Sequence, residues 1–354
     1  ATIYNLCMED NESIILYAQW RRRTSTLEID PNGGAYGGKT GIEKSMEEVL
    51  CGVKGTVNLT VNQSGKVLSQ TTNTQPVAGN DVYLSIDSEL QKACYYILER
   101  NIAAILRDKL VPDMDYGTKG ENANDITIPI FEVYYALLEN RVIDVNHFSS
   151  IEATELEKKI QYIFAEKQRV LLDQLKQILS AESTITNDKV SAELQEYLNY
   201  IYSKAVSSEL LLKKQINTDD KTYIRYQNNE ISMSEFFRYA ITKNWISTSS
   251  FSDKDTYYST SELYTMFLEY LFHQVESDTA FKNMIYHTLV FDNIISGKDI
   301  CLLLFDQHII EYNESSISKL QNGRISAFQF MYDLIDNLEI TPGQLGLEPC
   351  SGSI

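Results

Sequence analysis

Apolar and polar residues alternate along parts of the first third of the chain, a pattern that predicts β-strands. Val57, Leu59 and Val61 are separated by polar residues, and a polar turn sequence follows at residues 62–65. This arrangement predicts a β-hairpin. A short apolar run at residues 82–86 predicts one more strand.

The period of the apolar residues changes to that of a helix after Asp87, whose carboxylate is placed to cap the first turn. Five residues at near-helical spacing predict a helix over residues 88–110 with one buried stripe: Leu90, Cys94, Ile97, Ile102 and Ile105. Residues 150–180 are expected to form one or two amphipathic helices, and residues 192–212 another. The whole of residues 111–337 is therefore expected to be a helical block.

One local pattern recurs four times in this block: an apolar residue, a serine, two variable residues, a carboxylate or amide, and a second apolar residue. In a capping box the serine accepts from the third helical N–H, and the acidic or amide side chain reaches back. The pattern predicts four helix starts, each stabilised by about 1 kcal/mol, at Ser232, Ser259, Ser296 and Ser326. The recurrence suggests stacked helical hairpins, although its uneven spacing argues against a true solenoid.

Calcium binding is the alternative explanation, because an isoleucine-serine step before an acidic residue also closes an EF-hand loop. Counting back, the first and third ligand positions would hold three pairs: Ile224 and Tyr226, Thr288 and Val290, and Ser318 and Leu320. These pairs cannot bind calcium in that way. Helix capping is therefore favoured.

The composition is ordinary for a soluble globular protein, with 354 residues, 43% hydrophobic and 23% charged. This length predicts two or three folded units. Lysine and arginine number 31 against 49 aspartates and glutamates, which gives a formal net charge of -18. A negative charge of this size repels phosphate backbones, so nucleic acid is not expected as a partner.

Neither the cysteines nor the histidines follow a metal-binding or disulfide pattern. The cysteines number 5 and include no CxxC pair, and no two of the 4 histidines have ligand spacing on one helix. We therefore expect no metal ion and no cofactor. The longest apolar runs fall short of the roughly 20 residues that span a bilayer, and the N-terminus lacks the order of a signal peptide.

Motifs of serine acyltransferases occur only as isolated fragments. Such an active site needs Ser-x-x-Lys, Ser-x-Asn and a later Lys-Thr-Gly. The Lys-Thr-Gly at residues 39–41 precedes every candidate nucleophile and is expected to form a turn. Ser316 and Lys319 satisfy Ser-x-x-Lys in what reads as a polar segment between helices, and Ser351 has Ile354 where lysine is needed. We therefore expect no catalytic residue in the chain.

Two separate stretches resemble one protein family. Residues 41–44 read GIEK and residues 79–91 read GNDVYLSIDSELQ, while residues 338–354 read LEITPGQLGLEPCSGSI. These motifs resemble the non-catalytic part of class B penicillin-binding proteins, the peptidoglycan D,D-transpeptidases, of clostridial type. The resemblance implies that the catalytic serine lies beyond residue 354. Residues 1–34 are similar to a listerial B-type surface repeat.

From the pattern and the resemblance together we expect an α+β fold, in which a small β-rich N-terminal part and a pedestal-like unit precede a mostly α-helical domain. Residues 1–34 would be the β-rich, repeat-like segment, and residues 35–111 the pedestal unit of dimerisation type. Residues 112–337 would form a helical insert. Residues 338–354 would lead into the transpeptidase domain.

The resemblance implies that the chain is the scaffold region of a membrane-anchored transpeptidase in cell-wall synthesis, and that it positions the catalytic domain and docks partners. The chain would then have no enzymatic activity, while the parent protein would bind penicillin on the extracytoplasmic face of the membrane in a Gram-positive-type bacterium. The implied partners are cell-wall synthesis proteins or peptidoglycan, with a homodimer as a further expectation. The alternative is a surface-displayed binding or adhesion module with no enzymatic parent.

Overall fold

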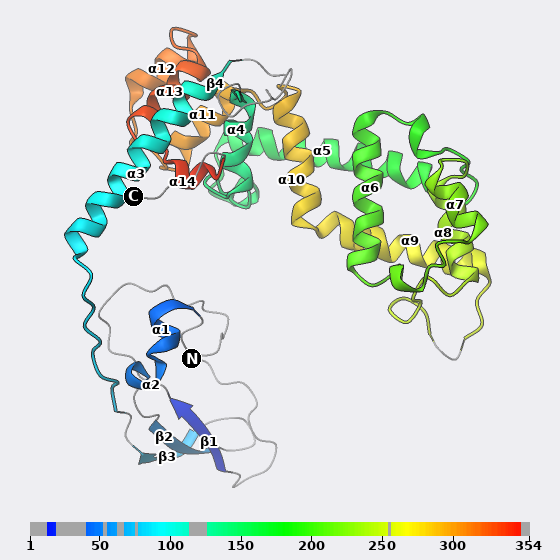
Figure 1. Cartoon of the computed structure of the whole chain (residues 1–354), viewed down its shortest axis with the longest axis horizontal. Coiled ribbons are helices and arrows are strands. Elements are labelled where there is room, and N and C mark those ends of the chain that lie inside the picture. Colours follow the sequence, from blue (N-terminus) through cyan, green and yellow to red (C-terminus); the bar gives the residue numbers. More distant parts are fainter. Residues whose placement is uncertain are drawn as a thin grey trace. The chain divides into compact units, whose positions relative to one another are not determined.

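The computed structural model describes residues 13–18, 40–51, 55–61, 67–74, 77–112, 126–253 and 256–347 (Figure 1). The chain divides into two compact units, residues 1–91 and residues 92–354. The first unit holds a small sheet and short helices, and the second is almost entirely helical. The expected α+β class is confirmed.

The first unit contains an antiparallel sheet with the strand order β1 (Ser13–Ala18), β2 (Gly55–Val61) and β3 (Val67–Thr74). β2 and β3 form the predicted hairpin. β1 lies in the expected repeat-like segment, yet it pairs with β2 of the expected pedestal unit, with Ile15 opposite Asn58. The sheet therefore joins two segments that the sequence pattern separates.

Two short helices, α1 (Gly41–Ser45) and α2 (Glu47–Leu50), precede β2. The predicted strand at residues 82–86 is wrong, because no strand forms there. Three of its side chains are more than half exposed: Tyr83, Leu84 and Ile86. An isolated apolar run is not enough for a strand, since each strand needs a neighbour for its backbone hydrogen bonds.

Asp87 caps helix α3 (Ser88–Lys109) as predicted, and its Oδ1 accepts from the N–H groups of Glu89 and Leu90 at 3.0 Å each. The predicted buried stripe of this helix is wrong at three of its five residues, whereas Ile102 packs partly buried against the core and Cys94 is partly buried. The exposed fractions along it are 63% for Leu90, 53% for Ile97 and 45% for Ile105. The helix instead buries Ala103 and Leu106, because a helix with apolar residues on two sides buries the side that its neighbours cover.

The second unit begins with the rest of α3 and a two-residue parallel pairing of β4 (Leu110–Val111) with β5 (Ile128–Pro129). The other helices follow in chain order: α4 (Ile130–Glu139), η2 (His147–Ser149), α5 (Glu155–Ile178), η3 (Asn187–Lys189), α6 (Ala192–Ser207), η4 (Lys213–Gln215), α7 (Lys221–Gln227), α8 (Met233–Thr242), α9 (Thr260–Ser277), α10 (Thr279–Phe291), α11 (Gly297–Asp306), α12 (Glu314–Gln321), α13 (Ala327–Asp336) and α14 (Pro342–Leu345). The predicted helices at residues 150–180 and 192–212 are confirmed as α5 and α6.

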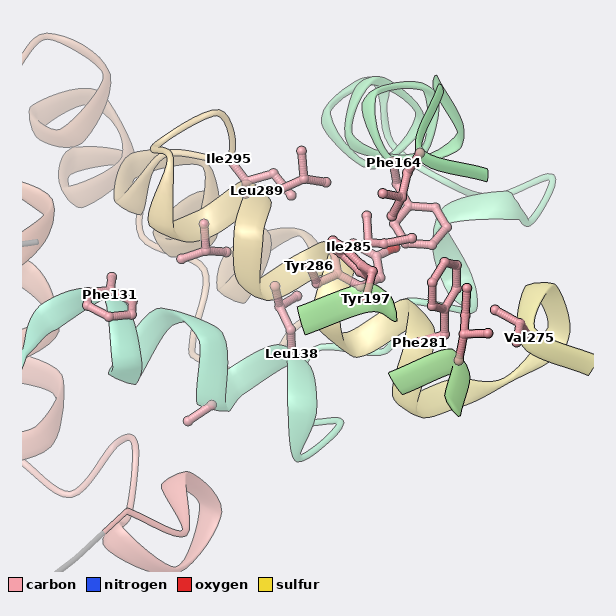
Figure 2. Close-up of a cluster of buried hydrophobic side chains, with 14 of the residues drawn as sticks. Phe131, Leu138, Phe164, Tyr197, Val275, Phe281, Ile285, Tyr286, Leu289 and Ile295 are labelled. Carbon is pink, nitrogen blue, oxygen red and sulfur yellow. The ribbon is translucent and has the colours of Figure 1, made fainter. Parts of the chain in front are cut away.

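Helix α10 is the centre of this unit, because it packs against α4, α5 and α9. Figure 2 shows Phe281, Ile285 and Leu289 of α10 among buried side chains from several other helices. Tyr286 of α10 stacks on Phe164 of α5, with ring centroids 4.5 Å apart. In Figure 1, α10 lies between the group that contains α4 and the group that contains α6 and α9. One helix thus supplies core to both groups.

All four helix starts predicted from the serine pattern are confirmed. Ser232, Ser259, Ser296 and Ser326 each accept a hydrogen bond from the backbone N–H three residues later. At Ser259 and Ser296 the acidic side chain also bonds the serine N–H and completes a capping box. At Ser326 the amide of Gln329 donates to Asp333 at 2.8 Å instead.

The connections between the last helices share a backbone geometry that recurs at intervals of 15 residues. Asn293, His308, Gly323 and Leu338 each follow a helix and have φ between 54° and 66°. This left-handed conformation turns the next N–H groups back onto the last carbonyls of the helix. An isoleucine packs into or against the core two residues further on in each case: Ile295, Ile310, Ile325 and Ile340.

Gly297, at the start of α11, lies under the ring of Tyr134 in α4. A Cβ at this position would lie 2.4 to 2.7 Å from three atoms of Tyr134. We expect Gly297→Ala to lower the free energy of unfolding by roughly 1–3 kcal/mol, because overpacking forces the ring or the backbone to move. Urea denaturation followed by circular dichroism measures this change.

Gly343→Ala in α14 is the matched control, since the nearest atoms to its Cβ lie at 3.7 and 3.8 Å, which is ordinary contact. The stability of this variant should stay within about 0.5 kcal/mol of the parent or rise slightly. Equal losses in both variants would contradict the steric explanation.

Candidate functional site

A groove opens in the second unit beside the short helix α12, and we call it the α12 groove. The volume of this open groove is about 680 Å³, and ligand pockets typically measure roughly 300–1,000 Å³. Its walls come from the end of α11, residues 309–313, α12, α13 and residues 337–339. Helical segments that are separate in sequence therefore form it.

The groove has an apolar base and a charged rim. Phe305, Ile310, Phe330 and Leu334 reach its base from the core, and each is at most 8% exposed. The rim carries three carboxylates and one ammonium group, all on exposed residues: Glu311, Asp333, Glu339 and Lys319. Such a mixed lining suits a ligand that is itself partly apolar and partly charged.

The groove lies where the 15-residue pattern of the connections is broken. In the connection that begins at His308, Glu311 occupies the position at which the neighbouring connections carry a capping serine or threonine. The cap is instead Asn313, with φ -140° and ψ 99°. Helix α12 is consequently 8 residues long, whereas α11 and α13 have 10 each, and it buries Leu320 alone. The shorter helix leaves room beside α13.

The Ser-x-x-Lys motif lies on this groove. Ser316 and Lys319 belong to helix α12, so the expectation that they lie between helices is wrong. The error arises because α12 carries a single buried leucine and has almost no apolar stripe. A serine nucleophile needs its base within hydrogen-bond reach, and no hydrogen bond between these two side chains occurs in the described part of the chain.

The other two acyltransferase fragments are only partly described. Thr40 is the N-cap residue of α1, although its side chain makes no capping hydrogen bond, and Gly41 is the first helical residue. The Lys-Thr-Gly motif therefore runs into a helix. Lys39 and the segment at residues 348–354, including Ser351, lie outside the described residues.

Residues that often bind metals are scattered through the structure. Among the described residues, no three histidine, cysteine or acidic side chains are grouped closely enough to hold a metal ion. Cys94 and Cys301 are free thiols. No helix in the described ranges is long and apolar enough to cross a membrane.

A buried carboxylate ties three segments of the second unit together. Glu157 in α5 is fully buried, and its Oε1 lies 2.8 Å from both Nδ1 of His147 and Nε2 of Gln307. Its Oε2 accepts from the Thr154 N–H at 2.7 Å. Gln307 also bonds the backbone N–H and carbonyl of Asp144. The carboxylate thus links the start of α5, η2 and the end of α11.

These contacts shift two pKa values in opposite directions. Burial on its own would raise the pKa of Glu157, but the hydrogen bonds from Gln307, Thr154 and His147 together outweigh it and lower that pKa. The hydrogen bond to Glu157 raises the pKa of His147. At pH values between the pKa of Glu157 and the pKa of His147, the network therefore favours an ionised Glu157 and a protonated His147.

The stability of the chain should depend on pH through this network. The contribution of Glu157 is present above its ordinary pKa of 4.5 and is lost as pH falls through its lowered folded value. The contribution of His147 is present below its ordinary pKa of 6.5 and is lost as pH rises through its raised folded value. We expect the melting temperature to decline on both sides of that window.

Substituting His147 separates the decline of the melting temperature at alkaline pH from the decline at acidic pH. His147→Gln should remove part of the decline on the alkaline side, whereas His273→Gln, on the exposed side of α9, should leave it in place. Thermal melts from pH 4 to 9 measure both. If the melting temperature of the His147 variant still declined by the same amount at alkaline pH, another group would be the cause of that decline.

Comparison with known proteins finds a family match for one part of the chain. Residues 23–84 match the family model of the penicillin-binding protein dimerisation domain. The described residues in this range, which include α1, α2, β2 and β3, belong to the first unit. The groove and Glu157 lie outside the match.

Over 69 residues the chain is 39% identical to the peptidoglycan D,D-transpeptidase MrdA of Escherichia coli K12, which covers 20% of this chain and 11% of the relative. The proteins of the same name from strains O6:H1 and O157:H7 give the same values. The aligned stretch thus spans about a ninth of the length of these curated relatives. No solved structure matches the chain. The matches show that the chain contains a region of the penicillin-binding protein family.

Proposed function

We propose that the chain is the non-catalytic region of a class B penicillin-binding protein and acts as a scaffold for its transpeptidase domain. The observation that carries the proposal is the match of residues 23–84 to the dimerisation domain. The identity of 39% with a named peptidoglycan D,D-transpeptidase supports it. Peptidoglycan cross-linking would then be the activity of the parent protein.

The domain organisation follows from the same proposal. Residues 35–111 would be the pedestal, residues 112–337 a helical insert of clostridial type, and residues 338–354 the lead-in to the transpeptidase domain. The insert assignment rests on the resemblance of residues 295–307. The listerial-type repeat stays a proposal for residues 1–34, of which the structure describes β1.

The location and the partners are part of the proposal as well. A membrane-anchored transpeptidase works on the extracytoplasmic side, where its substrate is, and the chain would dock cell-wall synthesis proteins or peptidoglycan there. The name of the matched domain supports a homodimer. The apolar side chains of α3 that point away from the core, such as Ile97 and Ile105, offer exposed surface for such contacts.

Fluorescent penicillin tests the scaffold assignment directly. We expect no covalent labelling of residues 1–354 and strong labelling of the full gene product, because the acylated serine would lie in the transpeptidase domain. Gel fluorescence after denaturation measures both.

Ser316→Ala provides the control for the Ser-x-x-Lys motif in the α12 groove. Labelling of residues 1–354 that disappears in this variant would make Ser316 a nucleophile and contradict the scaffold assignment. A full gene product that is never labelled would contradict the transpeptidase assignment of the parent.

A further inference from the structure

We propose that the α12 groove binds an extended segment of a partner protein that carries an arginine or lysine next to a bulky apolar side chain. This inference goes beyond the scaffold function, since it names the groove and the chemistry of its occupant. It concerns residues outside the matched dimerisation domain and does not depend on the activity of the parent protein.

The charges on the rim select a basic ligand. Within the described part of the chain, the side chains of Glu311, Glu339 and Lys319 have no hydrogen-bond or ion-pair partner. Asp333 accepts one bond, from Gln329. Three carboxylates against one ammonium leave the rim acidic, and the net charge of -18 adds a long-range attraction for cations. Charge complementarity therefore favours a basic segment.

The aromatic side chains of the groove select a ligand with an apolar side chain and a guanidinium or ammonium group. Phe305 and Phe330 lie at its base with ring centroids 5.7 Å apart. Ile309 and Ile325 beside them are only partly buried, so an apolar side chain of the ligand would cover them. Tyr312 on the rim is 70% exposed and follows Glu311 directly. Its ring face is available to a cation held by that carboxylate.

The connection before α12 departs from the sequence pattern of the neighbouring connections, which supports a functional role for the groove. A serine or threonine in place of Glu311 would follow the rule of the neighbouring connections and would start the helix earlier. The chain instead has an exposed acidic residue and an exposed tyrosine at this point. Departures from local folding rules are expected at functional or strained sites.

Peptide binding by the full chain of residues 1–354 tests the proposal. The probe is a fluorescein-labelled octapeptide, GSRFKLGS, measured by fluorescence anisotropy in low salt. Two comparison probes are GSEFELGS, which reverses the charges, and GSRGKGGS, which removes the apolar side chains. We expect saturable binding of the first probe alone, with an affinity that falls as salt is added.

Variants locate the binding site. The triple variant Glu311→Gln, Asp333→Asn and Glu339→Gln should weaken binding roughly tenfold, since each exposed charge contact contributes modestly. Tyr312→Ala should weaken it roughly twofold to fivefold. The matched control neutralises three exposed carboxylates outside the groove and should leave binding unchanged: Glu196→Gln, Glu269→Gln and Glu276→Gln. Circular dichroism confirms that the variants fold.

Several outcomes would overturn the proposal. They are the absence of binding, equal binding of GSRGKGGS, and equal weakening by the groove and control variants, which would assign the effect to net charge. Sedimentation of the chain alone tests a second copy as the occupant. A dimer lost in the groove variant would replace the partner segment with that copy. The penicillin assay is independent, so failure here would leave the scaffold assignment standing.

Discussion

The helical unit depends on how the chain turns between short helices without losing backbone hydrogen bonds. Each helix leaves four N–H groups and four carbonyls without partners inside the helix. A residue with positive φ follows α4, α6, α7 and α8 as well as α10 to α13: Arg141, Glu209, Asn229, Asn244, Asn293, His308, Gly323 and Leu338. The N–H groups after it bond back to the helix, as Ile294 does to Leu289 at 2.9 Å. Turn geometry and core packing are thereby joined in the last connections, because the isoleucine two residues after the turn packs into or against the core.

Features that depend on neighbouring residues could be predicted from the sequence. The hairpin, the Asp87 cap and the four serine caps each rest on positions within a few residues of one another. The capping box at Thr341 falls outside the serine pattern, although threonine caps a helix in the same way. With Thr341 included, the interval of 15 residues from Ser326 shows that the spacing there is regular.

Features that depend on distant residues could not be predicted. The buried side of α3 is decided partly by α13, where Asp336 accepts from Arg107 Nη1 at 2.6 Å. Thr154 and Glu157 have the spacing of a capping box, but this spacing does not indicate that Gln307, 150 residues further along the chain, provides another donor to Glu157. The α12 groove has no continuous motif either. The one sign of the groove in the sequence is Glu311, which stands where the neighbouring connections have a capping serine or threonine.

The chain enters and leaves the helical unit at adjacent places. β4 pairs with β5 directly before α4. α14, the last helix of the unit in chain order, also packs against α4. Asn140 at the end of α4 donates to the carbonyls of Leu345 and Gln344 at 2.6 and 3.2 Å. A Cβ on Gly343 would lie 3.7 Å from Glu99 of α3, which places α14 beside α3 (Figure 1).

This adjacency bears on how such a unit is accommodated in a longer protein. A segment whose two ends meet can be inserted into a structure without separating the parts on either side of it. Arg107 and Asn140 fix the two ends onto the same helical group through α13 and α14. The two ends of the helical unit therefore lie close together, which supports the proposal that residues 112–337 are an insert.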